Sequence, residues 1–205
     1  MEDKDIYAEI SSIKSLMERS SKFISLSGLT GILAGIYALI GACIGYQLVG
    51  RYDGLSYRSY PTNDPATLWK LAFVAIGVLV LSLITGIVLT IRKAKRKGQS
   101  ISNPVSKRLA VSLFIPLLTG GLLILILLFN GLYGLILPAC LIFYGLALVA
   151  GSQYTYNDVK SLGLCELLLG LLAATYPGYG LVFWTIGFSF LHIIYGGIMH
   201  FKYDR

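Results

Sequence analysis

The chain has 205 residues, of which 56% are hydrophobic and only 13% are charged, and its formal net charge is +7. Ordinary soluble domains carry roughly 25% charged residues, and a soluble globule of this length could not bury so much apolar side chain. The composition therefore excludes a soluble enzyme, a disordered chain, a collagen-like fibre and a secreted disulfide scaffold, and it indicates an integral membrane protein.

Residues 1–22 are expected to form a cytoplasmic amphipathic helix that is separate from the membrane bundle. Ile6, Ile10, Ile13 and Met17 recur at helical spacing, so they share one stripe of the helix. Acidic residues stand at the start of this segment and basic residues at its end, which suits the helix dipole. The stripe could dock on the bundle, lie on the membrane surface or pair with a second copy.

Residues 23–205 are predicted to form an all-α bundle that crosses the membrane six times. A helix needs about 20 apolar residues to cross the hydrocarbon core. The predicted spans cover about residues 23–49, 68–91, 109–129, 132–150, 162–175 and 181–201. The fifth is short and is interrupted by Glu166, so it could be a re-entrant segment. An extension back to Asp158 as the helix N-cap would give it an ordinary spanning length, and we count it as a span.

The distribution of lysine and arginine predicts the orientation of the bundle. If the N-terminus is cytoplasmic, 14 of the 17 basic side chains fall on the cytoplasmic side, whereas Arg51, Arg58 and Lys70 fall on the other side. This bias follows the positive-inside rule, so we expect both termini in the cytoplasm. The positive charge then reflects topology and contact with anionic lipid headgroups, and we expect no nucleic-acid partner.

Residues 13–22, followed by the glycine-spaced first span, resemble the corresponding part of small bacterial multi-span membrane proteins that carry no assigned function. This resemblance covers about the first fifth of the chain and implies no activity and no site residue. The acidic N-terminus and the long first apolar run indicate that the first span acts as an uncleaved insertion signal. We expect an integral protein of the bacterial cytoplasmic (inner) membrane.

The first span carries small residues at the spacing of a helix-packing face, namely Gly31, Gly35, Ala38, Gly41 and Gly45. They include two pairs of the small-xxx-small type, which let two helix backbones approach closely in lipid. The face could pack against another helix of the same bundle, or it could form the seam of a homodimer.

Glu166 is the only acidic residue well inside a predicted span, and it provides the one candidate site in the sequence. His192 lies in the sixth span, and Tyr195 lies at about the depth of Glu166. Because the fifth and sixth spans form a tight hairpin, these three side chains could meet and share a proton. The alternatives are a metal or polar-substrate site that adds His200, or a structural role in which Glu166 pairs with Lys160.

The sequence contains none of the motifs HExxH, GxSxG, GxGxxG, P-loop or CxxCH, and its three cysteines lack the spacing of a disulfide framework or a zinc site. We expect no catalytic residue, no metal and no cofactor.

We expect the protein to be a non-enzymatic structural, sensory or assembly component of the membrane that contacts a second copy or another membrane protein. The first alternative is a small transporter or channel with a proton- or ion-coupled path through Glu166 and His192. The second is a membrane-embedded enzyme acting on a lipid or quinone.

Overall fold

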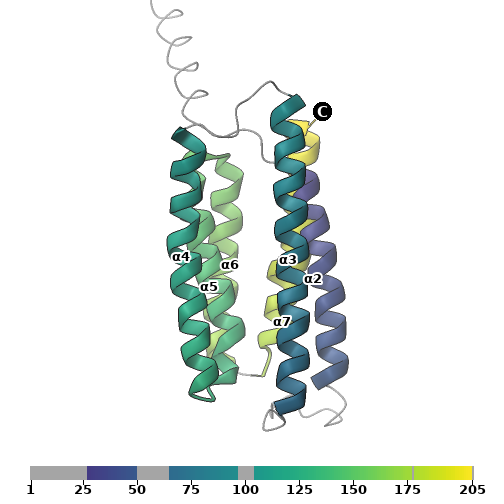
Figure 1. Ribbon diagram of the computed structural model, residues 1–205, viewed down its shortest axis with the longest axis vertical. Coiled ribbons are helices and arrows are strands. Elements are labelled where there is room, and N and C mark those ends of the chain that lie inside the picture. The colour runs from purple at the N-terminus through teal and green to yellow at the C-terminus, as the bar shows by residue number, and fades with distance from the viewer. Residues whose placement is uncertain (1–26, 50–64, 97–103, 177, 205) are drawn as a thin grey trace, which may run out of the picture.

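The computed structural model describes residues 27–49, 65–96, 104–176 and 178–204, and the regular elements of these residues are all helical. The long helices run roughly along one axis (Figure 1). The all-α prediction is therefore confirmed for the described residues. The amphipathic helix predicted for residues 1–22 lies outside them.

The long helices follow the predicted spans, with shifted ends. They are α2 (Gly28–Val49), α3 (Pro65–Arg96), α4 (Pro104–Phe129), α5 (Ile136–Gly151) and α6 (Asn157–Thr175). The last helical stretch begins with α7 (Gly180–Thr185) and continues through the π-helical segment η3 (Ile186–Leu191) into α8 (His192–Met199) and the π-helical segment η4 (His200–Asp204). Short 3-10 turns, η1 (Tyr133–Leu135) and η2 (Ser152–Tyr154), flank α5.

Five helical stretches are long and apolar enough to cross a membrane, namely Gly28–Val49, Ala66–Arg96, Pro104–Phe129, Tyr133–Tyr154 and Gly180–Tyr203. They support the prediction of a membrane protein with several transmembrane helices. The helix α6 is not among the five, because its 19 residues include Asp158, Lys160 and Glu166. The predicted fifth span, to which α6 corresponds, therefore stays a prediction.

The start of α6 differs from the expectation that Asp158 is its N-cap. The helix begins at Asn157, Tyr156 occupies the cap position, and no side chain caps the first turn. Asp158 lies inside that turn, where its carboxylate accepts hydrogen bonds from Lys202 and Tyr203 of η4. These long-range donors replace the local backbone donors that an N-cap side chain would bind.

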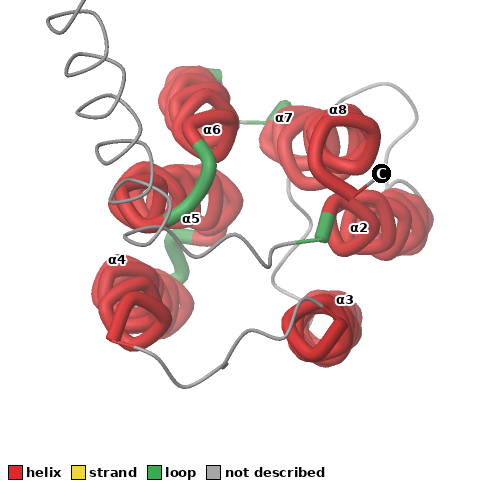
Figure 2. Tube along the Cα trace, turned by 90° about the horizontal axis from the view of Figure 1, so that it is seen from above, coloured by secondary structure: helices red, strands yellow, loops and turns green. Residues whose placement is uncertain are grey.

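Seen along their axes, the helices fall into two groups (Figure 2). In the first group α5 packs between α4 and α6, and in the second α2 packs between α3 and α8. The groups meet where α5 and α6 contact α7, η3 and α8. The apolar side chains of α3 are largely exposed in the bundle, which suits a helix that faces lipid.

Glycines allow the closest approach within each group. A Cβ added at Gly35 of α2 would lie 2.8 Å from the Ser189 carbonyl oxygen, and one added at Gly31 would lie 3.1 Å from the His192 carbonyl oxygen. Between α5 and α6, a Cβ at Gly145 would lie 2.7 Å from the carbonyl oxygen of another glycine, Gly163. Lipid tails are as apolar as the side chains, so close backbone packing is what holds such helix pairs together.

The helix-packing face predicted on the first span lies against several other helices of the chain. Gly31 and Gly35 approach η3 and α8, Gly41 approaches side chains of α3, and Gly45 approaches side chains of both α3 and α7. Ala38 is also buried. Other described helices of the same chain therefore lie against this face.

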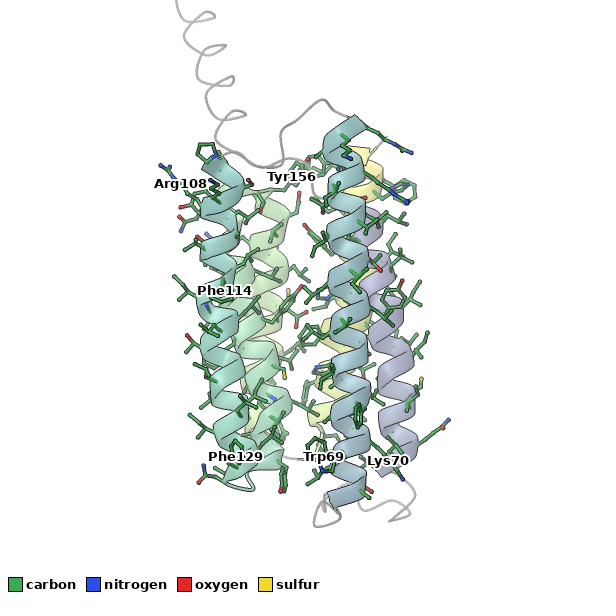
Figure 3. All side chains as sticks on the ribbon, in the orientation of Figure 1. Trp69, Lys70, Arg108, Phe114, Phe129 and Tyr156 are labelled. Atoms are coloured by element: carbon green, nitrogen blue, oxygen red, sulfur yellow. The ribbon has the colours of Figure 1, made fainter. Side chains whose placement is uncertain are left out.

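Basic side chains gather at one end of the bundle. They are Arg92, Lys93, Lys95 and Arg96 near the end of α3, Lys107 and Arg108 near the start of α4, Lys160 near the start of α6, and Lys202 in η4. Figure 3 shows Arg108 and Tyr156 at this end, which we call the Tyr156 end, and Trp69, Lys70 and Phe129 at the opposite, Trp69 end. Among the residues that the structure describes, Lys70 is the only lysine or arginine at the Trp69 end.

Candidate functional site

Glu166 of α6 is completely buried where the two helix groups meet. Its exposed fraction is 0%, and neither carboxyl oxygen has a hydrogen-bond partner among the described residues. Gly187 of η3 leaves room for the carboxyl group, because a Cβ built at Gly187 would collide with Glu166 Oε2. A buried carboxyl group without partners is costly in a protein interior, and more so within a membrane.

His192, the first residue of α8, is the ionisable side chain paired with Glu166. His192 Nδ1 lies 3.5 Å from Glu166 Oε1 and 2.9 Å from the Gly187 carbonyl oxygen. A carbonyl oxygen can only accept a hydrogen bond, so Nδ1 carries the proton and donates it. The same N–H thus has two acceptors nearby, a carbonyl at hydrogen-bond distance and a carboxyl group just beyond it.

Tyr144 of α5 binds the opposite side of the His192 ring. Its hydroxyl oxygen lies 2.8 Å from His192 Nε2. Since Nδ1 holds the proton of the neutral imidazole, Nε2 accepts a hydrogen bond from the Tyr144 hydroxyl. In an imidazolium the direction would reverse, with Nε2 donating to the Tyr144 oxygen. The three side chains bring α5, α8 and α6 together: a hydrogen bond joins Tyr144 to His192, and Glu166 Oε1 lies 3.5 Å from the His192 ring without a hydrogen bond.

The π-helical segment η3 determines how His192 meets this site. A π turn accommodates an extra residue in the helix, which rotates the residues that follow, and such turns are frequent at functional sites. The His192 ring binds the carbonyl of Gly187, five residues earlier in the chain. Gly187 thus does two things: its missing Cβ admits the Glu166 carboxyl group, and its carbonyl orients the imidazole.

Aromatic rings extend from His192 along η3 into α7. The ring of Phe188 stacks on that of His192 with centroids 5.8 Å apart, and it lies 4.9 Å from the ring of Tyr144. Trp184 of α7 lies 5.0 Å from Phe188. One intervening ring therefore separates Trp184 from His192.

The structure brings two of the three predicted site residues, Glu166 and His192, together. No described hydrogen bond joins Tyr195 to either of them. The electrostatic neighbours of Tyr195 include Asp158, which lies nearer the Tyr156 end. Lys160 is exposed and does not pair with the buried Glu166.

Tyr144 is the functional candidate that the sequence did not reveal. It lies 48 residues before His192, and no spacing rule connects two such residues on different helices. Within the described ranges, no group of three or more histidine, cysteine, aspartate or glutamate side chains is placed to hold a metal ion. The site consists of one carboxyl, one imidazole and one phenol, each of which has a proton that it can exchange.

No protein-family model matches this chain, and no curated protein or solved structure is significantly similar to it. A helical bundle can host many unrelated functions, so fold alone assigns none. Function is therefore inferred from the chemistry of the Glu166, His192 and Tyr144 side chains.

Proposed function

We propose that the protein is a non-enzymatic, multi-span membrane protein that takes up and releases a proton at Glu166. The exchange would alter the contact between the two helix groups, as in a small proton-coupled transporter or a membrane sensor. One observation carries the proposal: the Glu166 carboxyl group is fully buried and unpartnered, 3.5 Å from His192 Nδ1.

A purely structural role leaves this carboxyl group unexplained. An apolar side chain of similar size would avoid an unsatisfied buried group, which typically costs about 1–3 kcal/mol. Proton exchange, in contrast, benefits from a group whose charged and neutral forms are brought close in free energy by burial and a specific partner.

The two acceptors of the His192 N–H provide the coupling. While Glu166 is neutral, Nδ1–H binds the Gly187 carbonyl at the distance observed, 2.9 Å. An ionised carboxylate is a stronger acceptor than a carbonyl, so loss of the proton from Glu166 would draw this N–H to Oε1. The imidazole would turn and change its bond to Tyr144. Because these residues lie on α6, α8 and α5, the turn would shift the junction of the two groups.

The proposal includes six spans in the cytoplasmic membrane, with the Tyr156 end and both termini on the cytoplasmic side. The gathering of basic side chains at the Tyr156 end supports this orientation, and anionic headgroups would contact them there. The 19 residues of α6 support the fifth of these spans. At 1.5 Å per residue they extend about 28 Å, close to the roughly 30 Å of the hydrocarbon core.

Trp184 offers a direct test, because Phe188 links its ring to His192. The chain has two tryptophans, so Trp69→Phe leaves Trp184 as the sole emitter. We expect the emission of Trp184 to change with pH while the fold is intact, and to become insensitive to pH after Glu166→Gln. Lys160→Gln is the matched control, since Lys160 lies on the same helix but is exposed.

The proposal would be contradicted if the Trp184 emission of the parent protein did not change with pH, or if it changed equally after Glu166→Gln.

An experiment with sealed vesicles then distinguishes a transporter from a sensor. A transporter would move protons across the membrane under an imposed potassium diffusion potential, read by a trapped pH dye, and Glu166→Gln would abolish this movement. A fluorescence response without proton movement would assign a sensor.

A further inference from the structure

A polar cluster joins the start of α6 to η4, and we call it the Asp158 latch. Asp158 Oδ2 accepts a hydrogen bond from the Tyr203 hydroxyl at 2.9 Å, and Lys202 Nζ lies 3.3 and 3.2 Å from Oδ1 and Oδ2. The Tyr203 ring stacks on Tyr156 with centroids 3.9 Å apart. The Asp158 and Lys202 side chains are 30% and 54% exposed, so water reaches the latch.

The latch and the buried site use the same two helical stretches. Asp158 and Glu166 are eight residues apart on α6, so they share a helix face and lie about 12 Å apart along the axis. His192 and Tyr203 are the corresponding residues on the stretch formed by α8 and η4. The latch therefore fixes α6 against η4 at the Tyr156 end, and the Glu166–His192 pair joins the same stretches deeper in the bundle.

Between these two levels, buried side chains separate water from the site. Leu162 of α6 and Met199 of α8 occupy the intervening helix positions and are 6% and 1% exposed. Both side chains are apolar, so they offer water no hydrogen-bond partner between the latch and the site.

We propose that the Asp158 latch is a gate through which protons pass between Glu166 and the water at the Tyr156 end. When the latch is closed, Leu162 and Met199 keep water from the site. When it opens, α6 separates from η4, water reaches Glu166, and the carboxyl group gives its proton to that water. This inference rests on the proposed function, and it adds the side and the residues of proton entry.

Cysteine accessibility tests the gate without any proton measurement. In a protein whose native cysteines are replaced by alanine, Leu162→Cys reports on water between the latch and Glu166. We expect Asp158→Asn, which removes the charge but keeps the size, to speed labelling by a water-soluble thiol reagent about three- to tenfold. Tyr203→Phe should have the same direction of effect.

Two controls separate gating from general loosening. Ala173→Cys is on the same helix but on the far side of Glu166, and Ala173 is 1% exposed. Its labelling rate should not change with Asp158→Asn. Lys160→Gln alters a charge in the first turn of α6 without touching the latch, and it should leave labelling at Leu162→Cys unchanged. Unchanged labelling at Leu162→Cys in Asp158→Asn, or an equal rise at Ala173→Cys, would overturn the gate.

A pH jump distinguishes failure of the gate from failure of the proposed function. If Trp184 emission in the parent protein does not follow pH, the proton site itself is wrong. If it does follow pH, the gate requires Asp158→Asn to speed the response by a factor similar to that seen in labelling. A response whose rate is the same in both proteins would contradict the gate alone.

Discussion

At the residue scale, Gly187 and Glu166 are packed so closely that side chains at both positions would compete for the same space. The carboxyl group of Glu166 lies where a side chain at position 187 would begin. The pair therefore explains why a residue without a Cβ, the second residue of the π-helical segment η3, stands beside an unpartnered acid. It also makes the two positions energetically dependent on each other.

We predict that Gly187→Ala destabilises the protein by about 1–3 kcal/mol, because its Cβ collides with the Glu166 carboxyl group. In a protein that already carries Glu166→Ala, the same change should cost much less. A double-mutant cycle of detergent unfolding free energies measures this coupling. Equal costs in the two backgrounds would show that the two side chains do not compete for space.

The hydrogen-bond geometry also predicts the tautomer of His192. Nitrogen-15 NMR of the labelled histidine should find the neutral ring protonated at Nδ1, which donates to Gly187, and unprotonated at Nε2, which accepts from Tyr144. Tyr144→Phe should weaken this preference, because the donor to Nε2 is lost. A neutral ring protonated at Nε2 would contradict the arrangement.

At the scale of elements, α2 and α8 pack backbone against backbone in the second group. A Cβ added at Gly196 would lie 2.5 Å from Ile32 N and 2.6 Å from the Gly28 carbonyl oxygen. Both are backbone atoms, which cannot move aside without moving a helix. The adjacent Gly197 has nothing within 4 Å of its added Cβ.

This pair of neighbouring glycines gives a matched prediction. Gly196→Ala should separate α2 from α8 and lower stability by about 1–3 kcal/mol. Gly197→Ala should be neutral or raise stability by up to about 1 kcal/mol, because alanine is the better helix former. Thermal unfolding in detergent compares the two proteins, and similar losses in both would contradict the close α2–α8 contact.

The sequence predicts some of these contacts and misses others for physical reasons. The small-xxx-small spacing on α2 is visible along one helix, so its packing face could be identified in advance. Gly163 and Gly170 of α6 serve the α5–α6 contact in the same way, and their seven-residue spacing was a usable signal. The π-helical turn at η3 has no comparable residue signature, and its effect on His192 emerges only from the folded chain.

At the scale of the whole molecule, the Asp158 latch connects the start of α6 to the last described residues of the chain. Burial raises the pKa of the Asp158 carboxyl group, but hydrogen bonds from Tyr203 and Lys202 and the charge of Lys202 together lower it below the ordinary value of 3.8. A carboxyl group with a lowered folded pKa stabilises the fold above its unfolded pKa and loses that effect only as pH falls through the folded value.

The latch should therefore contribute the same stability at about pH 6 and about pH 8, both well above that window. We expect Asp158→Asn to lower the unfolding temperature by equal amounts at the two pH values, as measured by circular dichroism in detergent. If Asp158→Asn lowered the unfolding temperature at only one of the two pH values, a group other than Asp158 that titrates between them would control the latch.

At this scale, the sequence and the structure agree most closely on which basic residues lie together. Basic residues scattered through the chain come together at the Tyr156 end, because successive helices return to it. Because apolar segments of spanning length alternate with basic segments, the sequence alone predicts that the basic residues gather at one end. The sequence allows Glu166 to meet His192, because the hairpin between α6 and α7 brings their helices together. Tyr144 comes from another hairpin, so its contact with His192 is visible only in the packed structure.

Infrared difference spectroscopy tests proton exchange at Glu166 most directly, because it detects the carbonyl stretch of a protonated carboxyl group in the intact protein. We predict a band that disappears as pH rises, is absent after Glu166→Gln and persists after Asp158→Asn. A spectrum without such a band, or a band that survives Glu166→Gln, would contradict the assignment of Glu166 as the proton-binding group.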